Sequence, residues 1–113
     1  MKTLELFYQE TEIYFLLGNE GEVMINATEM AKIFKRRTKD FLKTDHAKSF
    51  IDVAERTLNG AHSDEKLIDN RGHVGIYFCR PLALKFAAWL DPEFEFWIFN
   101  QIDNILFGNY KKH

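Results

Sequence analysis

A cluster of cationic side chains near the end of the first third of the chain carries the clearest chemical signal in the sequence. Residues 32–48, the basic segment, hold seven basic and two acidic residues, a balance of +5, whereas the rest of the 113-residue chain holds eight basic and fifteen acidic residues, a balance of −7. Such local concentration of positive charge is typical of a surface that binds a polyanion. Interleaved apolar residues would anchor the segment to a core: Ile33, Phe34, Phe41 and Leu42. Charge alone leaves an alternative open, an ordinary solvated helix face.

The other chemically capable residues form no catalytic or metal-binding pattern. Ser49 and Ser63 lie in no nucleophile motif, and the chain has no glycine-rich phosphate loop. Cys79 lies among bulky apolar residues, which predicts a buried structural cysteine. Glu93 and Glu95 are two residues apart on a predicted helix, where side chains do not face each other. Metal-ligand spacing is absent among Cys79 and the histidines, which are His46, His62, His73 and His113. We therefore expect no enzyme, cofactor, metal or small-molecule substrate.

The composition predicts one folded domain over residues 1–113. Hydrophobic residues make up 46% of the chain, eleven residues are Phe, and the net charge is −2, which excludes a uniformly basic nucleic-acid coat. One cysteine fits a reducing compartment. The N-terminus has no apolar leader and no stretch is long enough to span a membrane, so we expect a cytoplasmic protein without a membrane partner.

The elements that would position the basic segment can be read along the chain. Residues 4–8 and 12–17 are rich in aromatic and β-branched residues and predict two strands, and residues 22–25 predict a third after a Gly/Asn turn at 18–21. Residues 22–25 would be the return strand of an N-terminal β-hairpin.

Three helices are predicted next. Asn26 begins the first as its cap, with Glu29 completing a capping box, and Thr38 caps a second, short helix. Two short helices with a tight basic connection outline a helix-turn-helix. The third helix runs from about Asp45 to Leu58, with a buried stripe of Ala47, Phe50, Ile51, Ala54 and Leu58.

The second half begins with a polar loop at residues 61–65. Residues 66–69 and 76–79 then predict short strands around residues 70–75, whose two glycines suit either a flexible finger close to a ligand or a plain turn. Pro81 suits the first turn of a core helix that ends at Leu90.

Asp91 caps the last helix, whose apolar residues cover more than one face. Either this helix crosses the middle of the domain, which we favour, or it offers an apolar patch to a second copy or to a missing segment.

Several motifs resemble the KilA-N domain. Residues 25–32, followed by 35–37 and 40–42, resemble its opening, and the later blocks at residues 77–78, 82–87 and 89–94 follow in the expected order. The resemblance covers about residues 12–107. Two positions depart from the family pattern: Tyr77 stands where Trp is usual, and Cys79-Arg80 stands where His-Pro is usual, with proline one place later at Pro81.

The resemblance implies a small winged-helix-like α+β fold that binds DNA, as in phages, large DNA viruses, phage-derived bacterial genes and the related fungal APSES domains. Residues 35–43 would be the DNA-facing helix-turn-helix segment and residues 70–75 the wing. We thus predict a phage-derived regulator of transcription that binds double-stranded DNA without catalysis. The predicted contacts are Lys35, Arg36, Arg37, Thr38, Lys39 and Lys43, with Arg71 and His73 from the wing.

Other partners stay open. A homodimer would use the C-terminal helix, and the main alternative function is a protein-interaction module, antirepressor-like, on that same aromatic helix. Single-stranded nucleic acid ranks lower, because Phe34 and Phe41 are predicted to point inward rather than to stack on bases.

Overall fold

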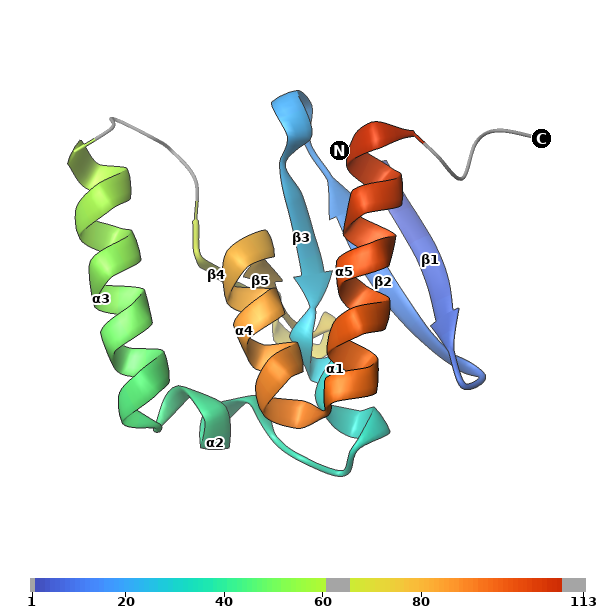
Figure 1. The fold of residues 1–113 in the computed structure, drawn as a ribbon, viewed down its shortest axis with the longest axis horizontal. Helices are drawn as coiled ribbons and strands as arrows, with labels where there is room; N and C mark the ends of the chain where they lie inside the picture. Colours follow the sequence, from blue (N-terminus) through green and yellow to red (C-terminus); the bar gives the residue numbers. More distant parts are fainter. Residues whose placement is uncertain (1, 61–65, 109–113) are drawn as a thin grey trace.

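The computed structural model describes residues 2–60 and 66–108. In this part of the chain one antiparallel sheet is packed with α-helices, which confirms the α+β class (Figure 1). The strands are β1 (Lys2–Tyr8), β2 (Thr11–Leu17), β3 (Val23–Asn26), β4 (Ile68–Asn70) and β5 (Ile76–Cys79). The helices are α1 (Ala27–Ile33), α2 (Thr38–Leu42), α3 (Asp45–Gly60), α4 (Arg80–Leu90) and α5 (Pro92–Phe107).

The strand order β1-β2-β3-β5-β4 joins two hairpins through the central strand β3. β1 and β2 pair along their whole length, from Lys2 opposite Leu17 to Tyr8 opposite Thr11. The strands predicted in the first quarter of the chain are confirmed, and a short 3-10 turn (Asn19–Gly21) occupies the predicted Gly/Asn turn. The strand predicted at residues 66–69 is observed two residues later, as β4. The predicted loop at residues 61–65 lies outside the described residues.

α4 is the central helix of the core. Leu82, Ala83, Phe86 and Ala87 are fully buried, and Pro81 lies in the first turn, both as predicted. α5 begins at the predicted cap, where the Asp91 carboxylate accepts a hydrogen bond of 3.0 Å from the backbone N–H of Phe94.

The favoured expectation that the last helix crosses the middle of the domain is wrong. α5 packs beside α4 as an outer helix (Figure 1), so only one of its stripes is covered. Phe94, Ile98 and Ile102 are buried, but three phenylalanines on the opposite side of the helix are exposed: Phe96, Phe99 and Phe107. Because α4 already fills the middle of the domain, the remaining apolar side chains of α5 lie on the surface.

The predicted capping box of α1 is half correct. The Asn26 side chain accepts a 3.1 Å hydrogen bond from the N–H of Glu29, as predicted. Glu29 does not complete the box: its carboxylate accepts a 2.8 Å bond from the Tyr14 N–H of β2. The reason is that Asn26 is also the last residue of β3, where it is paired with Tyr77. Burial raises the pKa of the Glu29 carboxyl, against the lowering effect of the Tyr14 N–H.

Candidate nucleic-acid interface

Two aromatic side chains anchor the ends of the connection between α1 and α2. Phe41 of α2 is buried, with its ring centroid 5.0 Å from that of Phe86 in α4. Phe34, at the end of α1, packs edge-on against Phe94 of α5 with a centroid distance of 5.2 Å. The basic residues between these anchors are therefore held by the core rather than carried on a loose loop, as the sequence predicted for both rings.

A Schellman motif ends α1 and turns the chain outward. The Arg36 N–H donates to the Ala31 carbonyl at 2.9 Å, and the Lys35 N–H donates to the Lys32 carbonyl at 3.2 Å. Lys35 occupies the left-handed position of this motif, with φ of 55°, where glycine is usual. A lysine there costs about 1 kcal/mol of backbone strain, and such strain is often found at functional positions.

The Arg36 guanidinium lies over an indole ring. Its guanidinium carbon is 3.9 Å from the centroid of the Trp89 ring, and Trp89 is itself stacked on Phe86 with an interplanar angle of 18°. A guanidinium that lies on an aromatic face keeps its N–H groups at its edge, where they can donate to another molecule. The core thus positions an exposed arginine side chain.

Arg37 is held by an ion pair within the same segment. Its Nε and Nη2 atoms each lie 3.2 Å from one oxygen of Asp40. This pairing lowers the pKa of the Asp40 carboxyl. The predicted Thr38 cap is wrong: Arg37 occupies the N-cap position without a side-chain bond, and Thr38 is the first helical residue. Both side chains of the pair are well exposed, so little free energy holds them together.

The residue that does cap a helix here is Thr44, which sequence reasoning missed. Its hydroxyl donates to the Phe41 carbonyl at 2.8 Å and accepts from the Ala47 N–H at 3.1 Å, so it joins the end of α2 to the start of α3. The predicted inward stripe of α3 is fully buried at Ala47 and half-buried at Phe50, Ile51 and Ala54. The Leu58 side chain lies outside the described part.

Cationic side chains from α1, the connection and α2 gather around one hollow of about 400 Å³. All seven basic residues of the segment are exposed. Four of them line the hollow: Lys32, Arg36, Arg37 and Lys39. Its other lining residues are Thr28, Ala31, Thr38 and Ile76. The predicted contacts Lys35 and Lys43 are exposed but do not line it.

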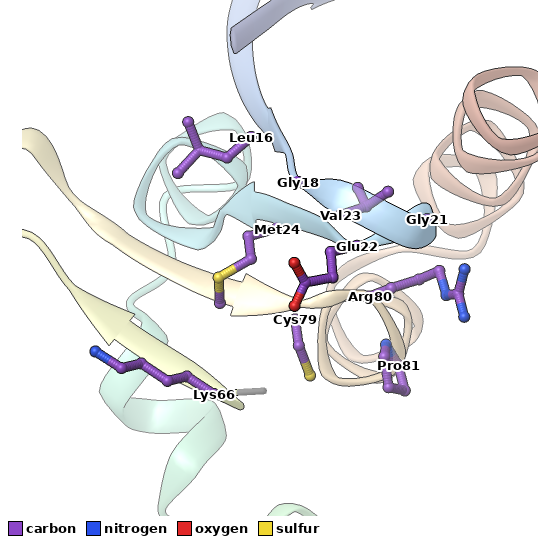
Figure 2. Close-up of a pocket in the computed structure, with 10 residues that line it drawn as sticks. All are labelled: Leu16, Gly18, Gly21, Glu22, Val23, Met24, Lys66, Cys79, Arg80 and Pro81. Atoms are coloured by element: carbon purple, nitrogen blue, oxygen red, sulfur yellow. The ribbon is translucent and has the colours of Figure 1, made fainter. Parts of the chain in front are cut away.

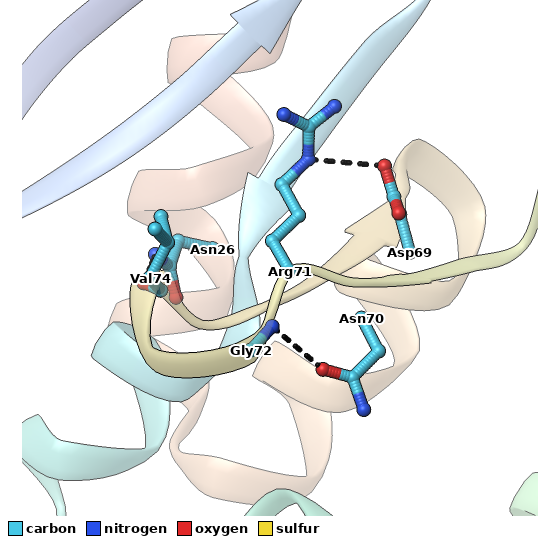
Figure 3. Close-up of polar contacts among 6 residues, drawn as sticks. All are labelled: Asn26, Asp69, Asn70, Arg71, Gly72 and Val74. Atoms are coloured by element: carbon cyan, nitrogen blue, oxygen red, sulfur yellow. Dashed lines mark hydrogen bonds and ion pairs between the residues drawn. The ribbon is translucent and has the colours of Figure 1, made fainter.

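β4 and β5 pair as a hairpin around residues 70–75, where two short strands were predicted. The Arg71 N–H donates to the Gly75 carbonyl at 2.9 Å across the tip, which contains a short 3-10 turn (Gly72–Val74). Arg71 donates from Nε to Asp69 at 3.0 Å, and Figure 3 shows its side chain and that of Asn70 on opposite sides of the hairpin. His73 is exposed at the tip. Neither Arg71 nor His73 lines the cationic hollow; of the described hairpin residues, only Ile76 does.

Two side chains at the start of α1 tie this hairpin to the helices. Asn26, which is 1% exposed, donates from Nδ2 to the Val74 carbonyl at 3.2 Å (Figure 3), and the Thr28 hydroxyl accepts from the Ile76 N–H at 2.9 Å. Gly75 has φ of 132°, and a Cβ there would lie 2.7 Å from the Asn26 oxygen. Asn26 was predicted only as a cap; its second bond joins residues 48 apart in the sequence, which no local pattern indicates.

A second cavity, of about 160 Å³, lies between the β2–β3 turn, the end of β5 and the start of α4 (Figure 2). Its charged lining residues are Glu22, Lys66 and Arg80, and none of the predicted contact residues lines it. Cys79 is buried beside it, as predicted. Figure 2 shows the Arg80 side chain extending away from the cavity toward α5.

Within residues 2–60 and 66–108, no three His, Cys, Asp or Glu side chains are grouped so as to hold a metal ion. No helix in those ranges has both the length and the apolar character needed to cross a membrane.

The sheet, the two short helices with their cationic connection and the tied hairpin define a small α+β domain with a basic hollow. The sequence profile of the KilA-N domain matches residues 8–108, so the chain belongs to the KilA-N domain family, which confirms the resemblance. KilA-N domains generally bind DNA. No curated protein and no solved structure matches the chain significantly.

Proposed function

We propose that this protein binds double-stranded DNA through the basic segment, with the β4–β5 hairpin as the wing of a winged helix, and performs no catalysis. The observation that carries the proposal is the gathering of four cationic side chains around one hollow. A phosphodiester backbone is the polyanion that such a surface fits. The family's general activity supports the same partner. The proposed setting is the cytoplasm, where the domain would act as a phage-derived regulator of transcription.

The two kinds of cation have different proposed roles. The lysines contact phosphates as mobile point charges. Arg36 is the candidate reader of base edges, because its guanidinium is positioned by the Trp89 ring and a guanidinium can donate to both the O6 and N7 atoms of guanine. Arg37 and Thr38 complete the contacts around the hollow, and the wing supplies further phosphate contacts. The proposed contacts are thus Lys35, Arg36, Arg37, Thr38, Lys39, Lys43, Arg71 and His73.

The salt dependence of binding tests this proposal directly. About four neutralised phosphates should lower the affinity for a duplex roughly a hundredfold between 50 and 200 mM salt. The measurement is a titration of labelled random-sequence duplex at several salt concentrations, followed by selection of bound sequences from a random pool. If the affinity does not change with salt, the phosphate backbone is not what the protein binds.

Replacing Asp40 by Asn is expected to tighten DNA binding by about two- to fivefold at 50 mM salt. The change removes an acidic group beside the hollow and releases Arg37 from its ion pair. Asp52→Asn is the matched control, since Asp52 holds Arg56 in a similar but more exposed ion pair on α3. Equal affinities of the two variants would show that the charge near Arg37 does not matter for docking.

The second candidate function is a protein-interaction module that uses α5, and the exposure of Phe96, Phe99 and Phe107 favours it. Contacts made by these rings are apolar, so salt would change their affinity little. Binding of a protein partner that survives alanine replacement of Arg36 and Arg37 would identify this function.

A further inference from the structure

The outer side of α5 displays three phenylalanine rings in a row. Phe96, Phe99 and Phe107 are 69%, 51% and 71% exposed. Their spacing along the helix places them on one face, opposite the buried residues Phe94 and Ile98. Exposed large aromatic rings are ordinary when they are scattered, but three on one face of a helix indicate a surface that another molecule covers.

A groove beside the second half of this row offers a place for such a ring. It lies between α4 and α5, has a volume of about 370 Å³, and is lined mainly by apolar side chains together with Arg80 and Asp103. The apolar lining residues are Leu84, Phe99, Ile102, Leu106 and Phe107. Phe96, the ring that projects from the first half of the helix, does not line the groove. The projecting ring and the groove are therefore at opposite ends of the same helix.

We propose that α5 pairs antiparallel with α5 of a second copy, so that Phe96 of each chain enters the groove of the other. A two-fold interface requires that one surface be complementary to itself. A ring at one end and a groove at the other end meet this requirement. The two-fold axis would pass near Ile102, where Phe96 of one copy lies level with Phe107 of the other.

The charges around α5 favour a second copy of this chain as the partner, and they favour an antiparallel arrangement of the two α5 helices. Glu93 and Glu95 lie in the first turn of α5, and Glu95 is exposed. Arg80 lies beside the opposite end, where its side chain extends toward α5 (Figure 2). Antiparallel pairing places Glu95 of each copy near Arg80 of the other, whereas parallel pairing would bring the acidic ends together. The helix dipoles also favour the antiparallel arrangement.

Sedimentation equilibrium of the full chain without DNA tests the pairing independently of the proposed function. We expect a concentration-dependent monomer–dimer equilibrium. Glu95→Arg alone and Arg80→Glu alone should each weaken it by about tenfold, because each change creates two like-charge contacts per dimer. Combining the two substitutions in one chain should restore the dimer to within about threefold of the parent. Phe96→Ser should abolish it.

Phe7→Ser is the matched control, since Phe7 is 62% exposed on β1, away from α5, and this variant should dimerise like the parent. A parent protein that stays monomeric at several hundred micromolar (about what a small interface needs) would overturn the proposal. So would a double charge variant that is as weak as the single ones, provided that thermal unfolding shows all variants folded.

Discussion

Replacing Arg36 and Arg37 together by alanine is expected to lower the affinity for duplex DNA by about a hundredfold at 50 mM salt. Both guanidinium groups are exposed, and that of Arg36 already lies on the Trp89 ring, so docking costs little further ordering of the Arg36 side chain. The slope of log affinity against log salt should fall by about one, for the phosphate contact of Arg37, because Arg36 is assigned to a base edge. Fluorescence anisotropy of a labelled duplex measures both quantities.

The matched control is the double variant Lys2→Ala, Arg56→Ala, which removes the same charge from exposed positions outside the basic segment. It should keep nearly the parent affinity, and neither double variant should change the free energy of unfolding by more than about 1 kcal/mol. If the two double variants bind DNA equally well, net charge rather than this segment governs binding, and the assignment of the site is wrong.

Replacing Asn26 by Asp is expected to lower the free energy of unfolding at pH 7 by about 2–4 kcal/mol. The new side chain can still accept from the Glu29 N–H, but it cannot donate to the Val74 carbonyl, and it places a carboxylate at a position that is 1% exposed. Urea unfolding measures the loss. Burial raises the folded-state pKa of the introduced carboxyl above its unfolded value, so the lost stability should return as the pH falls through that folded pKa.

The same chemical change in the exposed turn, Asn19→Asp, serves as the control and should cost less than about 0.5 kcal/mol. Asn26→Ala removes both hydrogen bonds without adding charge, so its stability should be low but should not recover at acidic pH. A variant Asn26→Asp that is as stable as the parent at pH 7 would mean that the bond to the hairpin contributes nothing to the fold.

Most elements of the fold could be predicted because they depend on local patterns. The periodicity of apolar residues located the strands and helices, and Asn26, Pro81 and Asp91 marked helix starts by their own chemistry. The buried position of Phe41 followed from its spacing in the basic segment. Patterns of this kind depend only on residues that are close together in the chain, so they can be recognised in a single sequence.

The missed features depend on partners that are distant in the chain. Glu29 binds the Tyr14 N–H, and Asn26 binds the Val74 carbonyl, because the sheet brings three strands to the start of α1. Thr38 and Thr44 are both acceptable caps by type, but α2 begins at Thr38 itself and only Thr44 caps a helix, α3. The exposure of one side of α5 likewise depends on which helix fills the centre of the core.

The exposure of the basic segment was predicted correctly, but the state of its arginines was not foreseen. Charge counting treats Arg36 and Arg37 as equivalent, whereas one lies on an indole and the other is paired with a carboxylate. The left-handed conformation of Lys35 could not be predicted from the sequence, because glycine is the residue that normally marks such a position. Whether these residues contact DNA stays a prediction until binding is measured.

The stacking of Arg36 on Trp89 gives the domain an optical reporter of its own. Indole emission responds to the electric field at the ring, and a guanidinium group 3.9 Å away contributes strongly to that field. Binding of an anion to the Arg36 guanidinium should therefore change the Trp89 emission, and no attached dye is needed. Trp97 is stacked on Phe94 in α5 and supplies a steady background, which Trp97→Phe would remove. The intrinsic fluorescence of unlabelled protein can therefore follow events at the basic segment in real time.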